Sequence, residues 1–252
     1  MTRALILAAG VGRRLGPRAE AGPKILIRIG GQSLLERHLR LLQFVGVTEI
    51  VLGIGFEAQR VEAELARLPY ARAMQISTIH NADYQRGSVV TIWSLRDALA
   101  AGGDVFVMDG DVLYDRRLLK RLVETPHRNC FLLDRDVEPG EEPMKLAMKD
   151  GDPVDFRKTL ERPHDFYGES VGFFRLDEKA ARDLATAARA LIDRGRSDDY
   201  FEEALRDVLL ASPPERFGVE DVTGLPWIEI DFPGDIERAE REILPALLPE
   251  DR

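Results

Sequence analysis

The chain has 252 residues, 44% of them hydrophobic and 31% charged, which is enough to bury a full core, so we expect one α/β domain over residues 1–252. A net charge of -9 and a pI near 5.1 argue against nucleic acid as a partner, because polyanion binding needs a basic face. No apolar run approaches the roughly 18 residues of a membrane span, and no charged-then-apolar leader opens the chain, so we expect a cytoplasmic protein without direct membrane contact.

The first predicted element is a buried strand at Ala4–Leu7 that leads into a glycine-containing loop. The loop fails two tests: a dinucleotide fingerprint needs glycine where Leu15 stands, and the Gly-Lys-Ser/Thr of a P-loop is absent here. Arg14 inside the loop and Lys24 after it would suit a triphosphate, because both can neutralise phosphate oxygens. From the glycine spacing alone, a plain turn with solvated basic residues explains the pattern equally well.

A family resemblance rests on the segment Leu7-Ala8-Ala9-Gly10-x-Gly12-x-Arg14-Leu15, followed by Pro23-Lys24-Ile25-Leu26. It resembles the signature loop of the nucleotidyltransferases that join a nucleoside triphosphate to a phosphorylated sugar or alcohol. The family usually has Ser or Thr before the arginine, where this chain has Arg13. The resemblance implies a nucleotide-binding set of Leu7, Ala8, Ala9, Gly10, Gly12, Arg14 and Lys24, with Arg14 and Lys24 also catalytic.

The resemblance covers nearly the whole chain and also implies the fold. We expect the three-layer, Rossmann-like α/β fold of nucleotide-diphospho-sugar transferases: a mixed, mostly parallel sheet with helices on both faces. Within it, a nucleotide half of about 1–128 would precede an acceptor-binding half of about 129–252.

The next segments alternate between helix and strand. A capping-box pattern at Ser33–Glu36 predicts a helix that continues to Gly46. Hydrophobic periodicity then predicts, in order, a strand at 48–54, a helix at 57–68 and a strand at 73–79. Such repetition implies a parallel sheet, and ligands bind such sheets beyond the carboxyl ends of the strands.

The loop at 81–88 precedes a helix through Ile92, Leu95 and Leu99. Ser88 can cap this helix, and the N–H groups of Gly87 and Ser88 could bind a base edge or a phosphate. A plain loop explains these letters equally well. In the family this loop helps to hold the base, so the resemblance adds Asn81, Gly87 and Ser88 to the nucleotide-binding set.

A buried strand at Val105–Met108 ends in two acids, Asp109 and Asp111. Buried carboxylates are costly unless they meet a cation, and hard oxygen ligands suit Mg²⁺. The alternative is that these acids only cap the helix predicted at 115–123. By the resemblance Asp111 is a catalytic magnesium ligand, and Asp109 is a less certain partner.

After residue 129 the pattern changes. We expect strands at 131–133, 144–148, 154–159 and 168–174, and an acidic loop at 138–143. The strand at 168–174 resembles the acceptor-binding strand of cytidylyltransferases that act on phosphorylated small alcohols. That likeness implies acceptor-binding roles for Glu169 and for the upstream Lys158. Without it, Lys158 would be a surface lysine and Glu169 a turn residue.

In the last third of the chain we expect two helices, one at 177–194 that Asp177 would cap and one from 199 onward, with Tyr200 and Phe201 as core aromatics. A strand at 226–231 then delivers Asp231 before a helix at 234–247. In the family the second metal aspartate has this context. Two strand-end aspartates, Asp111 and Asp231, are what one Mg²⁺ ion needs from the protein while phosphate oxygens and water complete its shell.

None of the four histidines has a catalytic-triad setting, and His38 is interpreted as a packing or surface residue. No enzyme nucleophile is needed if the acceptor's phosphate oxygen attacks the α-phosphorus. The resemblance favours transfer of CMP from CTP to phosphocholine, inositol 1-phosphate or aminoethylphosphonate. A quaternary ammonium would find candidate partners in Tyr84, Trp93, Phe166, Tyr167, Glu169 and Trp227.

Two alternatives remain. One is a hexose-1-phosphate nucleotidyltransferase that uses UTP or dTTP. The other is an inactive regulatory subunit that binds nucleotide, against which the presence of Arg14, Lys24, Asp111 and Asp231 argues. The sequence leaves the oligomeric state open, a homodimer included.

Overall fold

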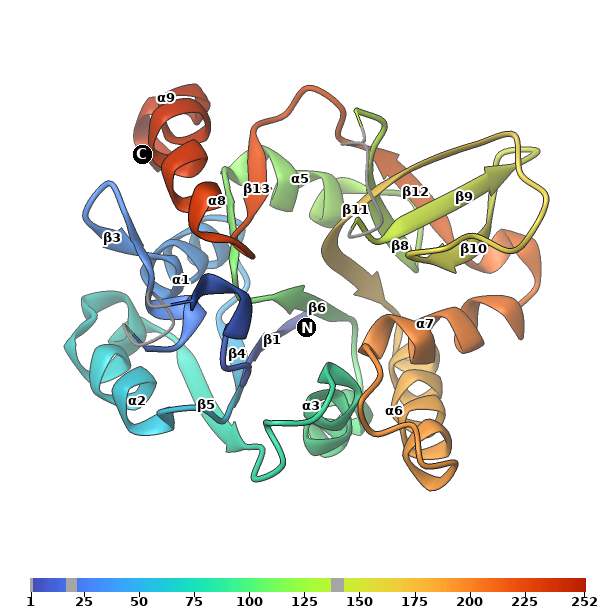
Figure 1. Cartoon of the computed structure of the whole chain (residues 1–252), viewed down its shortest axis with the longest axis horizontal. Helices are drawn as coiled ribbons and strands as arrows, with labels where there is room; N and C mark the ends of the chain where they lie inside the picture. The colour runs from blue at the N-terminus through green and yellow to red at the C-terminus, as the bar shows by residue number, and fades with distance from the viewer. Residues whose placement is uncertain (1, 17–21, 137–142) are drawn as a thin grey trace.

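Four parallel strands form the part of the central sheet that comes first along the chain. The computed structural model describes residues 2–16, 22–136 and 143–252, and within these the central sheet has nine strands, seven of them in the order β10-β9-β11-β6-β1-β4-β5 (Figure 1). The parallel strands are β1 (Arg3–Ala8), β4 (Glu49–Ile54), β5 (Gln75–His80) and β6 (Val105–Asp109).

The remaining strands extend this sheet in mixed directions. The long strand β11 (Phe166–Leu176) runs antiparallel to β6 and joins the two parts. Next to it lie β8 (Cys130–Asp134), β9 (Lys145–Lys149), β10 (Asp152–Arg157) and β12 (Gly218–Asp221). Strand β12 is absent from our sequence prediction. Of the acidic loop expected at 138–143, only Pro143 lies within the described residues.

Helices cover both faces of the sheet because successive residues of the central strands point to opposite sides. In β1, Ala4 and Ile6 pack with α1 (Leu34–Phe44), α2 (Ala58–Arg67) and α5 (Arg116–Glu124). Leu5 packs on the other face with α3 (Ser88–Ser94), α4 (Arg96–Ala100), α6 (Glu178–Asp193) and α7 (Phe201–Leu210). The predicted three-layer α/β class is confirmed (Figure 1). No helix in the described ranges is long and apolar enough to cross a bilayer.

Of the three helix N-caps predicted from the sequence, the structure confirms two. Ser33 accepts the N–H of Glu36 at 3.1 Å, and Asp177 accepts the N–H of Ala180 at 2.8 Å. The expected cap at Ser88 is wrong, because Gly87 precedes α3 without a side-chain cap. The Ser88 hydroxyl instead accepts the N–H of Phe201 at 2.8 Å, so it satisfies the first turn of α7.

A separate two-stranded sheet with its own hydrophobic cluster carries the C-terminal segment. Strand β13 (Trp227–Glu229) pairs antiparallel with β7 (Val112–Tyr114), and the short hairpin β2 (Arg28–Ile29) and β3 (Gln32–Ser33) lies beside them. A shared apolar cluster includes Leu113, Ile228 and Ile230.

The single helix predicted at 234–247 divides into α8 (Pro233–Arg238), a π-helical turn (Ala239–Ile243) and α9 (Leu244–Ala246). Pro245 lacks the N–H that a regular helix would use at this point, which explains why the α-helix does not continue unchanged.

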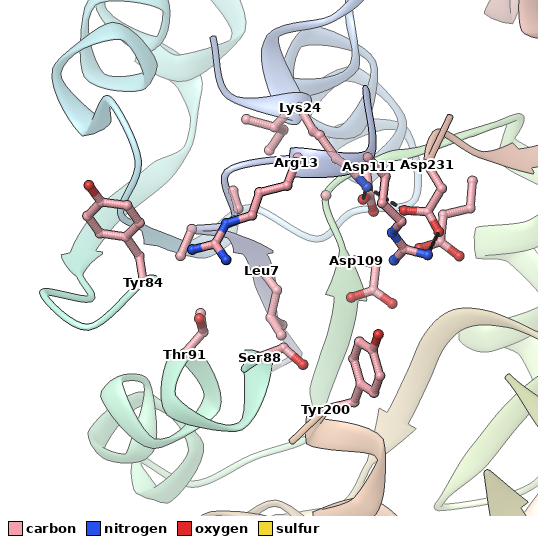
Figure 2. Close-up of a pocket in the computed structure, with 18 of the residues that line it drawn as sticks. Leu7, Arg13, Lys24, Tyr84, Ser88, Thr91, Asp109, Asp111, Tyr200 and Asp231 are labelled. Carbon is pink, nitrogen blue, oxygen red and sulfur yellow. Dashed lines mark hydrogen bonds and ion pairs between the residues drawn. The ribbon is translucent and has the colours of Figure 1, made fainter. Parts of the chain in front are cut away.

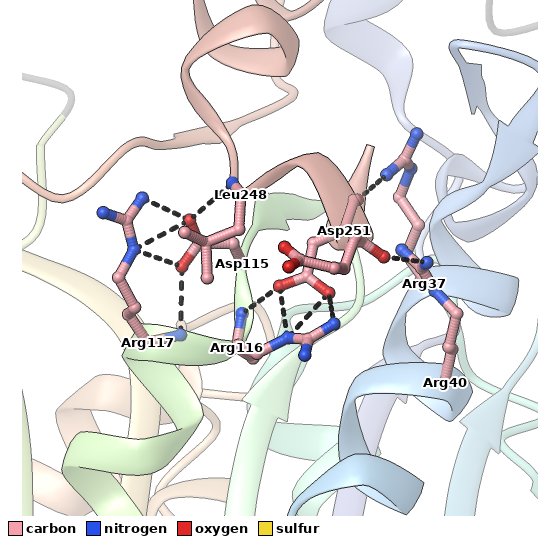
Figure 3. A network of polar contacts seen from close by, with 8 residues as sticks. Arg37, Arg40, Asp115, Arg116, Arg117, Leu248 and Asp251 are labelled. Carbon is pink, nitrogen blue, oxygen red and sulfur yellow. Dashed lines mark hydrogen bonds and ion pairs between the residues drawn. The ribbon is translucent and has the colours of Figure 1, made fainter.

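Charged groups fasten the end of the chain to the start of α5 (Figure 3). The buried Asp251 carboxylate accepts the backbone N–H of Arg116 at 3.0 Å and its guanidinium at 2.5 to 2.9 Å. Arg37 donates to the carbonyl of Asp251 at 2.7 Å. The Asp115 carboxylate pairs with Arg117 and accepts the N–H of Leu248 at 3.3 Å. Because α5 follows β7 directly, these contacts hold the C-terminal segment beside the strand that pairs with β13.

We expect Asp251→Ala to lower the free energy of unfolding by about 3 kcal/mol, since it leaves a partly buried guanidinium without its carboxylate. Glu250→Ala is the matched control: its side chain is exposed and only its backbone carbonyl contacts Arg40, so we expect a change within about 0.5 kcal/mol. Urea unfolding followed by circular dichroism measures both. Equal stability of the two variants would contradict a clamping role for Asp251.

Candidate active site

The carboxyl ends of β1 and β6 open into a cavity of about 290 Å³ (Figure 2). Most of the residues predicted from sequence line it: Leu7, Ala8, Ala9, Gly10, Gly12, Arg14, Lys24, Ser88, Asp111, Lys158 and Asp231. Three predicted residues are not among the lining residues: Asn81, Gly87 and Glu169. The cavity therefore gathers residues from both halves of the chain at the edge where a parallel sheet binds its ligands.

Lys24 forms ion pairs with both Asp111 and Asp231, which lie far apart in the sequence. Its Nζ lies 2.7 Å from Oδ2 of Asp111 and 2.6 Å from Oδ1 of Asp231, and all three side chains are mostly buried. Burial alone would lower the pKa of Lys24, but the two carboxylates outweigh burial and raise the pKa above its ordinary value. The ammonium therefore stays charged. Arg14 adds a second cation, 3.2 Å from the other Asp231 oxygen.

Backbone hydrogen bonds fix the positions of these aspartates. The N–H of Gly110 donates to the carbonyl of Leu7 at 3.0 Å, which ties the turn after β6 to the end of β1. The N–H of Ile230 donates to the carbonyl of Asp111 at 2.9 Å, continuing the pairing of β13 with β7. The Asp235 carboxylate accepts the N–H of Asp231 at 2.9 Å. Strand pairing thus brings the two acids together.

A third acid, Glu229, belongs to the same group. Carboxylate oxygens of Asp111, Glu229 and Asp231 all lie within 4.8 Å of one another. Burial and the neighbouring carboxylates raise the pKa of Glu229 well above its ordinary value. Sequence reasoning missed it, although residues two apart on a strand share a face, so Glu229 and Asp231 could have been grouped. Three clustered carboxylates offer the hard oxygen donors that suit Mg²⁺.

Asp109 lies deeper and next to Gly172. Burial, followed by repulsion from Glu202, Asp111 and Glu229, raises the pKa of Asp109 well above its ordinary value. Gly172 has a φ of +79°, and a Cβ on it would lie 2.3 Å from the Asp109 Oδ2 atom. Glycine at this point of β11 therefore makes room for the Asp109 carboxylate.

His38 lies behind the acidic turn, so of the two interpretations, packing or surface, the structure confirms packing. It is fully buried on α1, and its Nε2 lies 3.3 Å from the carbonyl oxygen of Gly110. A carbonyl only accepts, so Nε2 carries the proton and Nδ1 accepts the hydroxyl of Tyr114 at 3.1 Å. Burial lowers the pKa of His38 to about 4, which keeps the ring neutral at pH 7.

The glycine loop and Lys24 are in close contact. Gly12 has a φ of +65°, and a Cβ there would lie 2.9 Å from the Lys24 Cγ atom. The lysine stem thus passes directly over the loop backbone. Arg13, the residue that departs from the family pattern, also lines the cavity, and the Arg14 guanidinium lies 5.4 Å from the centre of the Phe232 ring.

The loop at 81–88 contributes through other residues than those predicted. Asn81 is buried and donates to the Thr91 hydroxyl at 3.0 Å, and the N–H of Gly87 donates to the Ser197 carbonyl at 2.9 Å. These two predicted ligands shape the loop in the present structure. The side chains that border the cavity here are Tyr84, Arg86, Ser88 and Thr91 (Figure 2).

Lys158, which the sequence predicted to bind the acceptor, lines the cavity together with residues at the start of α7. Tyr200 is 45% exposed and lines the cavity, so its interpretation as a core aromatic is wrong, whereas Phe201 is fully buried as expected. The Lys158 ammonium lies 4.7 Å from the centre of the Tyr200 ring. Glu169 is half-buried on β11, opposite Lys145 of β9. Of the residues suggested for a quaternary ammonium, Tyr84 alone is among the lining residues in the described ranges.

Glu202, which sequence reasoning missed, also faces the cavity. Its Oε2 atom is buried and has no hydrogen-bond partner among the described residues. Burial raises the pKa of Glu202 to about 7. Consecutive acids at a helix start usually serve the helix dipole, so the sequence held no signal for this orientation.

Comparisons with known proteins show which family the chain resembles in sequence and in fold. Residues 4–162 match the MobA-like NTP transferase domain. The chain is 31% identical over 249 residues to the CMP-5'-(3-aminopropyl)phosphonate synthase of Streptomyces rubellomurinus, covering 96% of this chain and 39% of that protein. It is 29% identical over 245 residues to the bifunctional IPC transferase and DIPP synthase of Rubrobacter xylanophilus, covering 96% and 52%. The chain thus spans about half or less of the length of these relatives.

A solved structure shows the same fold. The CTP:phosphocholine cytidylyltransferase of Streptococcus pneumoniae superposes with a TM-score of 0.73 at 20% identity, covering 96% of this chain and 99% of that chain.

The neutral His38 predicts a pH-dependent stability. Its pKa of about 4 lies below the unfolded value of 6.5, so the unfolded chain binds more protons between these values and stability falls as the pH falls below 6.5. Between pH 7 and pH 5 we expect His38 to account for a loss of about 2 kcal/mol. Urea unfolding of the wild type and of His38→Gln at both pH values measures this share. The same pH dependence in both proteins would contradict it.

Proposed function

Because the chain belongs to the MobA-like NTP transferase family, we propose that it transfers CMP from CTP to a small acceptor with a phosphate or phosphonate group and releases pyrophosphate, with Mg²⁺ as cofactor. One observation carries the proposal: Lys24 joins Asp111 and Asp231 beside the glycine loop, in one cavity. The names of the relatives, a CMP-phosphonate synthase and a phosphocholine cytidylyltransferase, support cytidine over other bases.

The chemistry needs positioning and charge neutralisation rather than an enzyme nucleophile. An oxygen of the acceptor's phosphate or phosphonate attacks the α-phosphorus of CTP, the bond from that phosphorus to the β-phosphate bridging oxygen breaks, and pyrophosphate leaves. Lys24 and Arg14 would donate to phosphate oxygens as negative charge moves toward the leaving group. Asp111 and Asp231 would hold Mg²⁺, which when bound would supply Lewis-acid stabilisation of the phosphate charge.

The division of labour follows the two predicted halves. In the nucleotide half, the glycine loop and Ser88 line the cavity, and we assign the triphosphate and base to them. In the acceptor half, Lys158 lines the cavity, and we assign the acceptor's anionic group to it. Glu169 would act on the acceptor only through β11, since the cavity lining does not include it.

The acceptor end favours a substrate that carries a cation. The Glu202 oxygen, which has no hydrogen-bond partner in the described part of the chain, and the half-exposed Tyr200 ring both line the cavity. An ammonium group would pair with the carboxylate and pack on the ring face, whereas a neutral polyol would leave the carboxylate with the charge of Lys158 but no direct cationic partner from the substrate. We therefore favour phosphocholine or an aminoalkylphosphonate over inositol 1-phosphate.

A pyrophosphate-release assay that crosses four nucleoside triphosphates with phosphocholine, aminoethylphosphonate, inositol 1-phosphate and glucose 1-phosphate tests the proposal. We expect the highest rates with CTP and an amine-bearing acceptor. Preference for glucose 1-phosphate with UTP or dTTP would instead identify a sugar nucleotidyltransferase. Tight nucleotide binding without turnover on any pair would identify a regulatory subunit.

Lys24→Met and Asp111→Asn should each lower kcat/KM at least about 100-fold while the far-UV circular dichroism stays unchanged, because both remove charge at the reacting phosphates. Lys179→Met is the control, since it removes a lysine from an exposed ion pair with Asp183 on α6. Near-normal rates in either site variant would refute the assignment of these residues.

Glu202→Gln should lower kcat/KM for amine-bearing acceptors about tenfold or more, and that for inositol 1-phosphate much less, because a charge-assisted contact is lost only with the cation. Tyr200→Phe keeps the aromatic face and should retain most activity, whereas Tyr200→Leu should not. An equal loss on all acceptors would mean that Glu202 is structural.

A further inference from the structure

The two aspartates assigned to Mg²⁺ already hold a cation that belongs to the chain. The Lys24 ammonium lies 2.7 Å from Asp111 Oδ2 and 2.6 Å from Asp231 Oδ1, which are oxygens that a divalent ion would also use (Figure 2). An ion ligated by these oxygens would come very close to Nζ, and the two positive charges would repel each other strongly in a mostly buried site. The ion and the ammonium therefore compete for these carboxylates.

Lys24 also has a structural reason to lie there. Three carboxylates within 4.8 Å of one another repel, so they need positive charge nearby. Lys24 neutralises one charge and joins the turn after β6 to the end of β13. Arg14 contacts the outer oxygen of Asp231 and offsets a second. Lys24 and Arg14 together thus supply the same positive charge as one divalent ion.

The position of the Lys24 side chain also allows its ammonium to reach a ligand in the cavity. Its Cγ atom lies beside Gly12 of the glycine loop, and Lys24 itself lines the cavity. A triphosphate bound by that loop would present oxygens to the same ammonium. When Nζ turns from the carboxylates to the phosphates, the acids lose their counter-ion and become a strong site for a divalent cation.

We propose that Lys24 is an exchangeable counter-ion: it holds Asp111 and Asp231 together in the nucleotide-free protein and yields them to a divalent cation only when a nucleoside triphosphate accepts its ammonium. The inference rests on the proposed metal role of these aspartates. It sets an order of events, in which the cation binds weakly to the free protein and enters together with the nucleotide.

Mn²⁺ binding to the nucleotide-free protein, followed by the electron paramagnetic resonance signal of unbound Mn²⁺, tests the proposal without turnover. We expect Lys24→Met to bind Mn²⁺ at least about tenfold more tightly than the wild type, since charge-assisted hydrogen bonds no longer oppose the ion. Lys179→Met should bind Mn²⁺ as the wild type does. Unchanged or weaker binding by Lys24→Met would overturn the proposal.

The double variant Lys24→Met with Asp111→Asn separates two kinds of failure. The double variant should lose the tight Mn²⁺ binding of Lys24→Met. If the double variant still binds Mn²⁺ tightly, the ion lies elsewhere and the proposed metal site is wrong as well. If Lys24→Met does not fold by circular dichroism, Lys24→Gln replaces it with the same expectation, because its neutral amide can still donate a hydrogen bond to a carboxylate.

A second measurement, the affinity for CTP, should change in the opposite direction to the affinity for Mn²⁺. In buffer with EDTA, calorimetry should show CTP binding to Lys24→Met about tenfold or more weaker than to the wild type. Tighter metal binding combined with weaker nucleotide binding is the signature of an exchanged counter-ion, whereas general damage to the site would weaken both. Equal CTP affinity in the two proteins would overturn the proposed exchange.

Discussion

The ammonium of Lys24 between Asp111 and Asp231 is the interaction on which the site depends. It joins three segments that are distant in sequence: the short helical turn η2 (Lys24–Leu26), the turn after β6 and the end of β13. Three acids this close cannot remain charged together without cations nearby, so the basic loop and the acidic strand ends require each other. The ion pairs of Lys24 therefore hold the basic segment against the acidic strand ends.

The surrounding structure limits how far these charges can move. The pairing of β13 with β7 fixes how far apart Asp111 and Asp231 lie. The contacts of Asp251 and Asp115 fasten the segment that follows β13 to the start of α5. On the other side, His38 and Gly172 define the space around the acidic turn. A rigid acidic side facing a basic loop suits a reaction that depends on positioning and charge rather than on an enzyme nucleophile.

Local signals in the sequence were sufficient for much of the fold. Strong apolar runs predicted β1, β4 and β6, and capping patterns at Ser33 and Asp177 predicted two helix starts. The glycine loop, Lys24 and the strand-end aspartates could be selected because together they resemble the nucleotidyltransferase pattern, whereas the glycine spacing alone fitted a plain turn equally well. Weaker signals failed where a partner from another element decides: the Ser88 hydroxyl serves α7 rather than its own helix, and the β12 edge strand depends on β8.

The sequence by itself determined the residue types of the site and the ends of strands on which they lie, because strand periodicity and carboxyl-end placement are local properties of the chain. Only the tertiary structure decided that Glu229 joins the two aspartates and that Tyr200 and Glu202 face the cavity. It also decided that Asn81 and Gly87 donate hydrogen bonds to Thr91 and Ser197 and do not line the cavity. The physical reason is that side-chain direction at a helix start, and the hydrogen bonds open to a buried group, depend on neighbours that are remote in sequence.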